Sequence, residues 1–185
     1  MRTALVTMES ISAYSQSNFL ASTRGPKESP DVFEERCWRE KAHSNAAGNI
    51  VIPAMAFKNA LDEATKRLQL KVKGGGQTTW TKYFQAGIAI NGDIELPVKA
   101  ADVEGEWLMM NADGRKGGGT RVRRCFPVIR EWKATVPYII LDDKITEDVF
   151  EKCVRESGLF VGIGRWRPEK CGLYGRFNVT KIQWS

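Results

Sequence analysis

Apolar residues at helical spacing mark two segments of the chain. Residues 55–70 repeat apolar side chains every three or four positions, and charged side chains fill the positions between them. Residues 147–157 show a similar pattern after Thr146, a residue type that favours the N-cap, and Gly158 is expected to end this helix. The pattern therefore predicts one amphipathic helix in each half of the chain.

Short apolar or β-branched runs predict strands around these helices. Asn91-Gly92 separates two of the runs and is a strong signal for a hairpin turn. In the last run the alternation breaks between Val179 and Ile182, which predicts a bulge or an early end. The runs cover residues 3–9, 49–53, 84–90, 94–98, 107–110, 134–142 and 177–184.

Without its insertions the chain reads strand, helix, strand, strand, helix, strand. This order predicts an α+β fold with a ferredoxin-like (RRM-like) βαββαβ core, in which an antiparallel sheet carries two helices on one face. We expect a single domain over residues 1–185, with inserted loops at about 12–50 and 71–124 and a projecting basic β-hairpin. The open face of such a sheet is a common nucleic-acid platform, although the same fold serves many unrelated activities.

The balance of charged residues is basic, with 28 Lys and Arg against 22 Asp and Glu and a formal net charge of +6. This excess permits nucleic acid or another anionic surface as a partner. The four cysteines contain no CxxC pair, so neither a zinc site nor a redox pair is predicted, and no cofactor or metal is expected. Because the sequence has no signal-peptide pattern and no apolar run of membrane-spanning length, we expect the protein in the cytoplasm and not in a membrane.

A basic, glycine-rich loop covers residues 113–124. Its three consecutive glycines would let the main chain approach a partner closely, and its cations suit phosphate oxygens. Arg121 and Arg123 are expected on one face of a strand and Arg124 on the other. The alternative is a solvated hairpin tip whose charges only confer solubility. The candidate nucleic-acid-binding residues of this loop are Arg115, Lys116, Arg121, Arg123 and Arg124.

A second loop, at residues 162–176, combines four glycines with cations and aromatic rings. Such a combination offers phosphate pairing together with stacking surfaces for unpaired bases. The loop lacks GxGxxG spacing and follows a helix, so a dinucleotide site is not predicted. The alternative is a tight turn, and at least one of the two aromatic rings is expected to pack on the core. The candidate binding residues of this loop are Arg165, Trp166, Arg167, Lys170, Tyr174 and Arg176.

A third glycine-rich stretch, residues 71–84, adds Lys82 as a binding candidate, with a flexible linker as the alternative. No catalytic residue is predicted, and the chain does not read as an enzyme. The single histidine, His43, stands alone in a charged segment, and the Asp142-Asp143 pair suits a turn. No GxSxG nucleophile elbow is present.

Two segments resemble motifs of the RAMP superfamily, the repeat-associated RNA-binding proteins of CRISPR systems. GNIVIPAMAFKNALDEATKRL, at residues 48–68, resembles the IPGSSLKGALR signature, with Lys58 at the signature lysine. GIGRWRPEKCGLYGRFNV, at residues 162–179, is similar to the glycine-rich loop that precedes the final strand. Residues 54–56 replace the small Gly-Ser residues of the signature, and Asn59 stands where glycine is usual.

The resemblance implies a non-catalytic effector-complex subunit that binds single-stranded RNA. In this comparison the 113–124 loop is the projecting, thumb-like hairpin, and the partners along the strand are copies of the chain or other effector-complex subunits. Some such subunits cut target RNA with an aspartate in the loop after the first strand, where this chain has Asp31. Two alternatives stay open: a phage protein that coats or anneals single-stranded DNA, and an anti-CRISPR protein that mimics a backbone subunit.

Overall fold

The computed structural model describes residues 1–112 and 119–185. Its largest sheet is antiparallel, with the strand order β4 (Ile88–Ile90), β8 (Lys133–Ile140), β1 (Arg2–Ser10) and β9 (Phe177–Trp184). Because side chains alternate between the two faces of a strand, β1 and β8 bury every second residue on the same face. The strands expected at both ends of the chain and before the second helix are confirmed.

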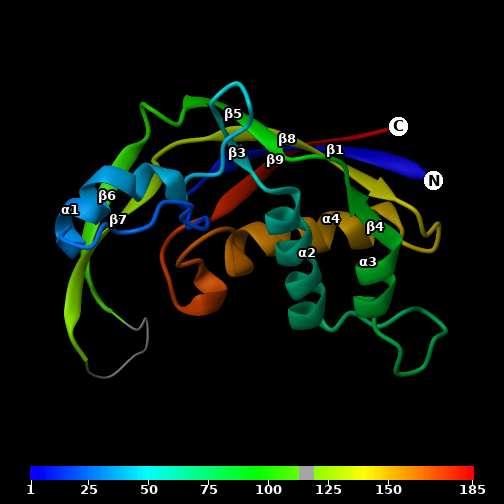
Figure 1. Cartoon of the computed structure of the whole chain (residues 1–185). Coiled ribbons are helices and arrows are strands. Elements are labelled where there is room, and N and C mark those ends of the chain that lie inside the picture. Colours follow the sequence, from blue (N-terminus) through cyan, green and yellow to red (C-terminus); the bar gives the residue numbers. More distant parts are fainter. Residues whose placement is uncertain (113–118) are drawn as a thin grey trace.

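Three helices lie against one face of this sheet (Figure 1). They are α2 (Ala54–Leu68), α3 (Thr81–Gly87) and α4 (Glu147–Glu156). The two helices that apolar spacing predicted are α2 and α4, and the phenylalanine in the first turn of each, Phe57 and Phe150, is fully buried. Among the described residues, no helix combines the length and the apolar character needed to cross a bilayer.

The second predicted helix does not end at Gly158. A π-helical segment, Ser157–Val161, continues α4 and ends at Gly162, whose φ of 73° favours glycine. Gly158 instead permits a close approach, because a Cβ atom there would lie 2.2 Å from the carbonyl oxygen of Phe177. The π-helical segment therefore covers the start of β9.

The hairpin expected around Asn91-Gly92 is not formed. The start of the expected first strand belongs to α3, and β4 pairs with β8. The next strand, β5 (Ile94–Lys99), pairs with β3 (Asn49–Ile52) in a separate two-stranded sheet. Gly92 adopts a φ of 74°, so the bend is present but joins strands of two different sheets. Long-range pairing thus overrides the local turn signal.

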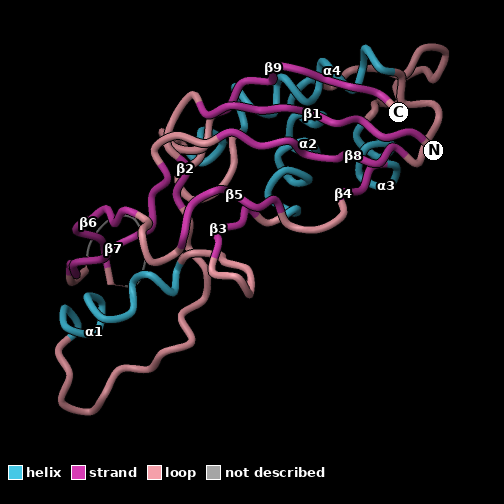
Figure 2. The backbone as a smooth tube through the Cα atoms, turned by 90° about the horizontal axis from the view of Figure 1, so that it is seen from above, coloured by secondary structure: helices cyan, strands magenta, loops and turns pink. Residues whose placement is uncertain are grey.

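A hairpin lies at the end of the elongated molecule that is remote from both termini (Figure 1, Figure 2). It consists of β6 (Glu104–Asn111) and β7 (Arg121–Ile129), and β2 (Tyr14–Ser15) adds to the other side of β7. The helix α1 (Pro30–Cys37), followed by a 3-10 turn at Trp38–Lys41, packs against β7. The expected insertions, about 12–50 and 71–124, therefore contain β6, the start of β7 and β4 of the main sheet.

The break in alternation near the C-terminus corresponds to a β-bulge. The pairing of β9 with β1 shifts register at Met8, and Thr180 is the extra residue on β9. β9 is also an outer strand of the sheet, and the Arg155 guanidinium donates a hydrogen bond to its Val179 carbonyl at 2.7 Å. The predicted irregularity is confirmed.

An aromatic cluster joins the two ends of the molecule. The Trp132 ring, between β7 and β8, has its centre 6.4 Å from that of Tyr14, 6.3 Å from Phe57 and 6.0 Å from Phe177. All four rings are buried. Because β2, α2 and β9 each contribute one ring, the cluster fixes the hairpin relative to the four-stranded sheet.

Candidate nucleic-acid interface

The second glycine- and arginine-rich segment contacts the two strands that flank the first one, β6 and β7. Arg165 of the second loop places its guanidinium carbon 3.6 Å from the ring centre of Phe126 on β7. Its Nη2 lies 3.5 Å from the sulfur of Met110 on β6. Tyr174 donates a hydrogen bond from its hydroxyl to Glu106, also on β6. The glycine-rich loop therefore lies against one side of the hairpin.

Backbone hydrogen bonds tie this loop to the segment that leads into β2. The Arg165 amide donates to the Ser15 carbonyl at 2.9 Å, and the Gly175 amide donates to the Ala13 carbonyl at 2.7 Å. Residues 13–15 in turn precede or form β2, which pairs with β7. The loop is thus fixed at both of its ends by contacts distant in the sequence.

The glycines of this loop permit close packing within the chain. A Cβ atom on Gly164 would lie 2.4 Å from the Tyr14 ring. A Cβ atom on Gly175, which has a φ of 75°, would lie 1.8 Å from the Ile163 carbonyl oxygen. No side chain larger than hydrogen fits at either position without moving the backbone around it.

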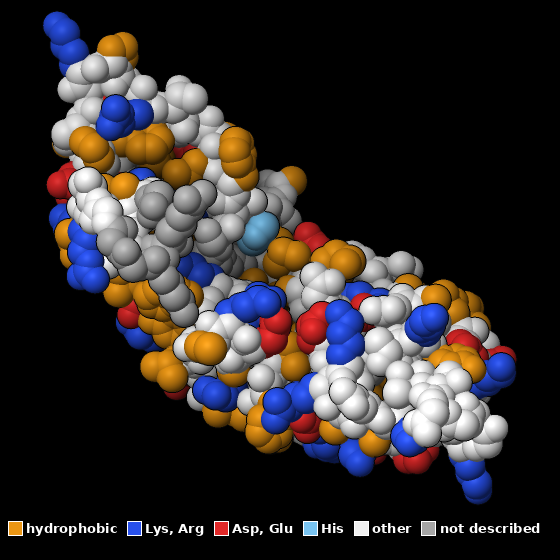
Figure 3. Space-filling model, turned by 90° about the horizontal axis from the view of Figure 1, so that it is seen from below, with side chains coloured by type: hydrophobic (Ala, Val, Ile, Leu, Met, Phe, Trp, Pro, Cys, Tyr) orange, Lys and Arg blue, Asp and Glu red, His pale blue; other side chains and the backbone are white. Residues whose placement is uncertain are grey.

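Three adjoining hollows run from the hairpin to α2, on the side of the molecule that Figure 3 shows. Ser17 lines the first and second hollows, while Ala56 and Gly164 line the second and third. We call this continuous depression the groove. Its cationic lining residues are Lys41, Arg124, Arg165 and Arg167, and its aromatic lining residues include Phe19, Phe33 and Phe126.

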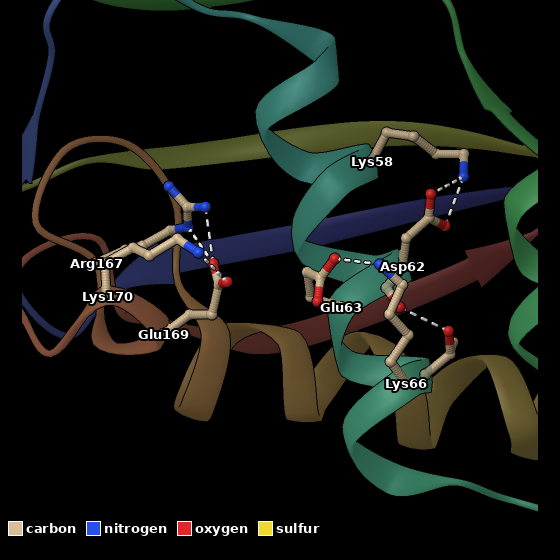
Figure 4. A network of polar contacts seen from close by, with 8 residues as sticks. Lys58, Asp62, Glu63, Lys66, Arg167, Glu169 and Lys170 are labelled. Atoms are coloured by element: carbon tan, nitrogen blue, oxygen red, sulfur yellow. Dashed lines mark hydrogen bonds and ion pairs between the residues drawn. The ribbon is translucent and has the colours of Figure 1, made fainter.

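Glu169 neutralises two of the candidate cations (Figure 4). One of its oxygens lies 2.7 Å from an Arg167 nitrogen, and the other lies 2.7 Å from the Lys170 ammonium. Burial acts to raise the pKa of Glu169, but the hydrogen bonds and charges of Lys170 and Arg167 outweigh it, so the pKa is lowered. The carboxylate is therefore ionised at neutral pH and competes with any phosphate for both cations.

Glu34 of α1 is the residue that sequence reasoning missed. Its carboxylate is fully buried and accepts hydrogen bonds from Lys41, from the Cys125 amide (2.7 Å) and from Arg124 (3.0 Å). Burial acts to raise the pKa of Glu34, but these hydrogen bonds outweigh it and lower the pKa. Glu34 lies three residues before Cys37, so the two side chains share the buried face of α1. This spacing is the sequence signal that could have predicted the burial of Glu34.

The arginines of β7 alternate between the two faces of the hairpin, as expected. Arg121 and Arg123 are exposed, and the guanidinium carbon of Arg123 lies 4.1 Å from the ring centre of Trp107. Arg124 is less exposed and lines the groove on the other face. The remaining candidates of the 113–124 loop lie outside the described residues: Arg115 and Lys116.

Two candidate lysines lie outside the groove. The Lys58 ammonium is buried, 2.5 and 2.6 Å from the two carboxylate oxygens of Asp62 and 3.2 Å from the Phe84 carbonyl (Figure 4). This lysine thus fixes α2 to α3. Lys82 is exposed on α3, at the end of the molecule opposite to the hairpin (Figure 1). The structure therefore does not bring either lysine to the two loops.

The two aromatic rings of the second loop lie outside the buried core, so the expectation that at least one of them packs on the core is wrong. The rings of Trp166 and Tyr174 stack, with centres 6.3 Å apart and 27° between their planes. Tyr174 is half-buried, and burial together with its bond to Glu106 raises its pKa to about 12. Trp166 is 42% exposed and has a φ of 53°, a left-handed conformation that non-glycine residues rarely adopt. Arg176, at the end of the loop, donates to the Leu159 carbonyl at 3.1 Å.

The open face of the four-stranded sheet lacks the features of a base-stacking platform. No aromatic ring lies on it among its four strands, all of which are described, and unpaired bases stack chiefly on aromatic side chains. The groove is therefore a better candidate for binding nucleic acid than this face of the sheet. The face instead carries threonine and aliphatic side chains, among them Leu5, Thr7, Thr135, Pro137 and Ile139.

The residues considered for catalysis lie apart. Asp31 is exposed in the first turn of α1, and His43 is half-buried beside the second hollow of the groove. Burial lowers the pKa of His43, although the charge of Asp93 opposes this effect. Within the described ranges, no group of three or more His, Cys, Asp or Glu side chains could hold a metal ion.

Neither a protein-family model nor a curated protein matches the sequence. Among solved structures, the protein is similar to a chain in a cryo-EM structure of the type III-B Cmr-beta bound to cognate target RNA, with a TM-score of 0.57 and 10% sequence identity. The match covers 99% of this chain and 60% of that chain, so the protein spans about three-fifths of the length of its structural neighbour. At this identity the likeness shows a shared fold alone, here a mixed α+β fold.

Proposed function

We propose that the protein is a non-catalytic subunit that binds single-stranded RNA in the groove between the hairpin and α2. The observation that carries this proposal is the contact of the glycine-rich loop with the hairpin through Arg165 and Tyr174. Because of that contact, two basic segments distant in the sequence border one depression. The proposed partners along the strand are copies of the chain or other effector-complex subunits, and the proposed location is the cytoplasm.

The arrangement of the main sheet supports a ferredoxin-like core and a RAMP-type relationship. The strand order β4-β8-β1-β9, with α2 following β1 and α4 following β8, is the order of a βαββαβ unit folded into one antiparallel sheet. The segment that resembles the RAMP signature begins α2, and the glycine-rich loop directly precedes β9. The structural neighbour was solved with target RNA, which favours RNA over DNA as the ligand.

Charge reversal on the hairpin tests this function. We expect Arg121→Glu combined with Arg123→Glu to weaken binding of a labelled uridine oligomer. Both arginines are exposed on the face of the hairpin turned away from the groove, so their reversal changes the electrostatic field around the groove and not a group that lines it. The slope of log affinity against log salt should fall by about 0.7 for each phosphate that the variant no longer binds. Fluorescence anisotropy over a salt series measures both quantities, and Lys82→Glu, at the opposite end of the molecule, is the control.

Wild-type affinity that does not change with ionic strength would contradict the phosphate-binding proposal. Competition between RNA and DNA oligomers of the same sequence separates RNA binding from the single-stranded DNA alternative, because only RNA offers a 2′-hydroxyl. A stable protein complex together with negligible affinity for either oligomer would favour the protein-mimic alternative.

Removing the Glu169 charge should strengthen binding. In Glu169→Gln, Arg167 and Lys170 lose their carboxylate partner and become available to phosphates, so we expect affinity to rise roughly threefold to tenfold and the salt dependence to steepen. Glu63→Gln is a matched control, because Glu63 pairs with Lys66 on α2 and does not line the groove. An affinity gain of the same size in both variants would indicate a general charge effect and contradict the prediction.

A further inference from the structure

Arg165 differs from the other cations that line the groove. Lys41 and Arg124 share the carboxylate of Glu34, and Arg167 is paired with Glu169. Arg165 has no carboxylate within ion-pair distance among the described residues. The carboxylate whose charge acts on the pKa of Arg165 is that of Glu106, which already accepts the Tyr174 hydroxyl.

The Arg165 guanidinium is nevertheless held in one position. Its central carbon lies 3.6 Å from the ring centre of Phe126 and 3.9 Å from that of Trp166, and Nη2 contacts the Met110 sulfur. Nη1 is buried and has no hydrogen-bond partner among the described residues. Burial lowers the pKa of this guanidinium. A fixed, partly desolvated cation loses little side-chain entropy when an anion binds, and an anion would compensate its charge.

The hollow beside Arg165 has a lining that suits an anion. It is formed by Gly164 and Arg165 from the loop, Tyr14, Gln16 and Ser17 from the segment around β2, His43, and Pro53 and Ala56 at the start of α2. No acidic residue is among these lining residues. The positive end of the α2 dipole adds to the favourable potential, while Asp93, which accepts the Ala54 amide at 2.9 Å, partly offsets it.

We propose that this hollow holds one phosphodiester group of the bound strand, with Arg165 as its counter-charge. The inference rests on the proposed function and identifies one subsite within the groove. Arg165 is then a binding residue for a phosphate at a fixed place, and the two other hollows hold the nucleotides on either side. Ala56, with its small side chain, leaves room for the phosphate where the second and third hollows meet.

Two substitutions test the subsite with the full-length protein and a labelled uridine oligomer. Arg165→Gln should weaken binding about tenfold to a hundredfold, the scale of one hydrogen-bonded charge pair. It should also reduce the slope of log affinity against log salt by about 0.7, the value for one phosphate on a single strand. Arg130→Gln is the matched control, because Arg130 is exposed, pairs with Glu104 and does not line the groove.

Ala56→Asp supplies an independent variant, because it places a carboxylate in the same hollow without removing Arg165. An acidic residue in the first turn of a helix is compatible with the helix dipole, so this variant should stay folded. It should lose affinity to a similar degree as Arg165→Gln. The neutral variant Ala56→Asn has a side chain of the same size, so it should lose clearly less affinity than Ala56→Asp, and the difference between the two variants measures the effect of the charge. Thermal unfolding of each variant without RNA establishes that it is folded.

An unchanged salt slope in Arg165→Gln or unchanged affinity in Ala56→Asp would overturn the subsite, even if the wild type binds RNA with a steep salt dependence. That combination would leave the proposed function intact. A lower affinity of Arg165→Gln with an unchanged slope would assign Arg165 a packing role and would also overturn the subsite. Absence of binding by the wild type at low salt would overturn the proposed function and the subsite together.

Discussion

Replacing Glu34 by glutamine is expected to lower the free energy of unfolding by about 3–5 kcal/mol, the cost of breaking a buried ion pair. The substitution leaves the ammonium of Lys41, a residue that is 5% exposed, without a charged partner. It also weakens the bonds to Arg124 and to the Cys125 amide, which fix α1 to β7. Chemical denaturation followed by tryptophan fluorescence measures the loss.

The adjacent residue provides the control for this variant. Glu35 pairs with Arg123 at 3.4 Å, and both side chains are about half-exposed, so Glu35→Gln should cost less than about 1 kcal/mol. Equal losses in the two variants would contradict a specific role for the buried carboxylate. Both residues lie on α1 and pair with arginines of β7. The difference in unfolding free energy between the two variants therefore reports the effect of burying the carboxylate.

The contribution of Glu34 should also depend on pH. Because the folded-state pKa of Glu34 lies below its ordinary value of 4.5, its stabilisation is complete above pH 4.5 and is lost as the pH falls through the folded-state pKa. The difference in unfolding free energy between the wild type and Glu34→Gln should therefore narrow in acid. A difference that stays constant from neutral pH into strong acid would contradict an ionised Glu34.

Gly175→Ala should destabilise the protein by about 3 kcal/mol or more and should also weaken RNA binding. The new Cβ atom would lie 1.8 Å from the Ile163 carbonyl oxygen, so the backbone of the second loop has to move. That movement disturbs the bonds from the Gly175 amide to Ala13 and from the Ile163 amide to Gly175. Denaturant unfolding and RNA anisotropy measure the two effects.

Gly74→Ala is a control that separates the steric clash of a new Cβ atom from the cost of a left-handed backbone conformation. Gly74 has a φ of 78°, close to that of Gly175, but a Cβ atom there would meet no atom within 4 Å. Its substitution should therefore cost only the left-handed backbone penalty of about 1–2 kcal/mol and should leave RNA binding unchanged. Similar losses of stability and affinity in both variants would show that the packing of the second loop is not decisive.

Local sequence patterns predicted the helices and strands whose apolar residues recur at a regular spacing along one face. The spacing around Phe57 and Phe150 located α2 and α4, and the break between Val179 and Ile182 located the bulge in β9. The Asn91-Gly92 signal failed, because β4 pairs with β8 and not with β5. The pairing of β4 with β8 joins segments about 50 residues apart in the sequence. Local patterns in one sequence do not show which distant strands pair.

The candidate site was only partly predicted, because it also depends on contacts between segments that are distant in the sequence. Composition identified both basic loops, but it did not show that Arg165 lies between Phe126 and Trp166, since Phe126 belongs to a strand of the hairpin. Charge alone also could not distinguish available cations from paired ones. Lys58 pairs with Asp62 one turn later on the same helix, and its burial depends on α3, whose Phe84 carbonyl accepts a hydrogen bond from its ammonium.

The Arg155 side chain limits the ways in which copies of the protein can join. An outer strand normally offers unpaired carbonyl and amide groups, to which a strand of another molecule can add. On β9, the Val179 carbonyl already accepts a hydrogen bond from Arg155, and the π-helical segment after α4 lies against the Phe177 carbonyl. The first half of this edge is therefore closed to strand addition. If copies of the protein line up along RNA as proposed above, neighbouring molecules are therefore expected to meet this half of the edge through side-chain contacts and not through an added strand.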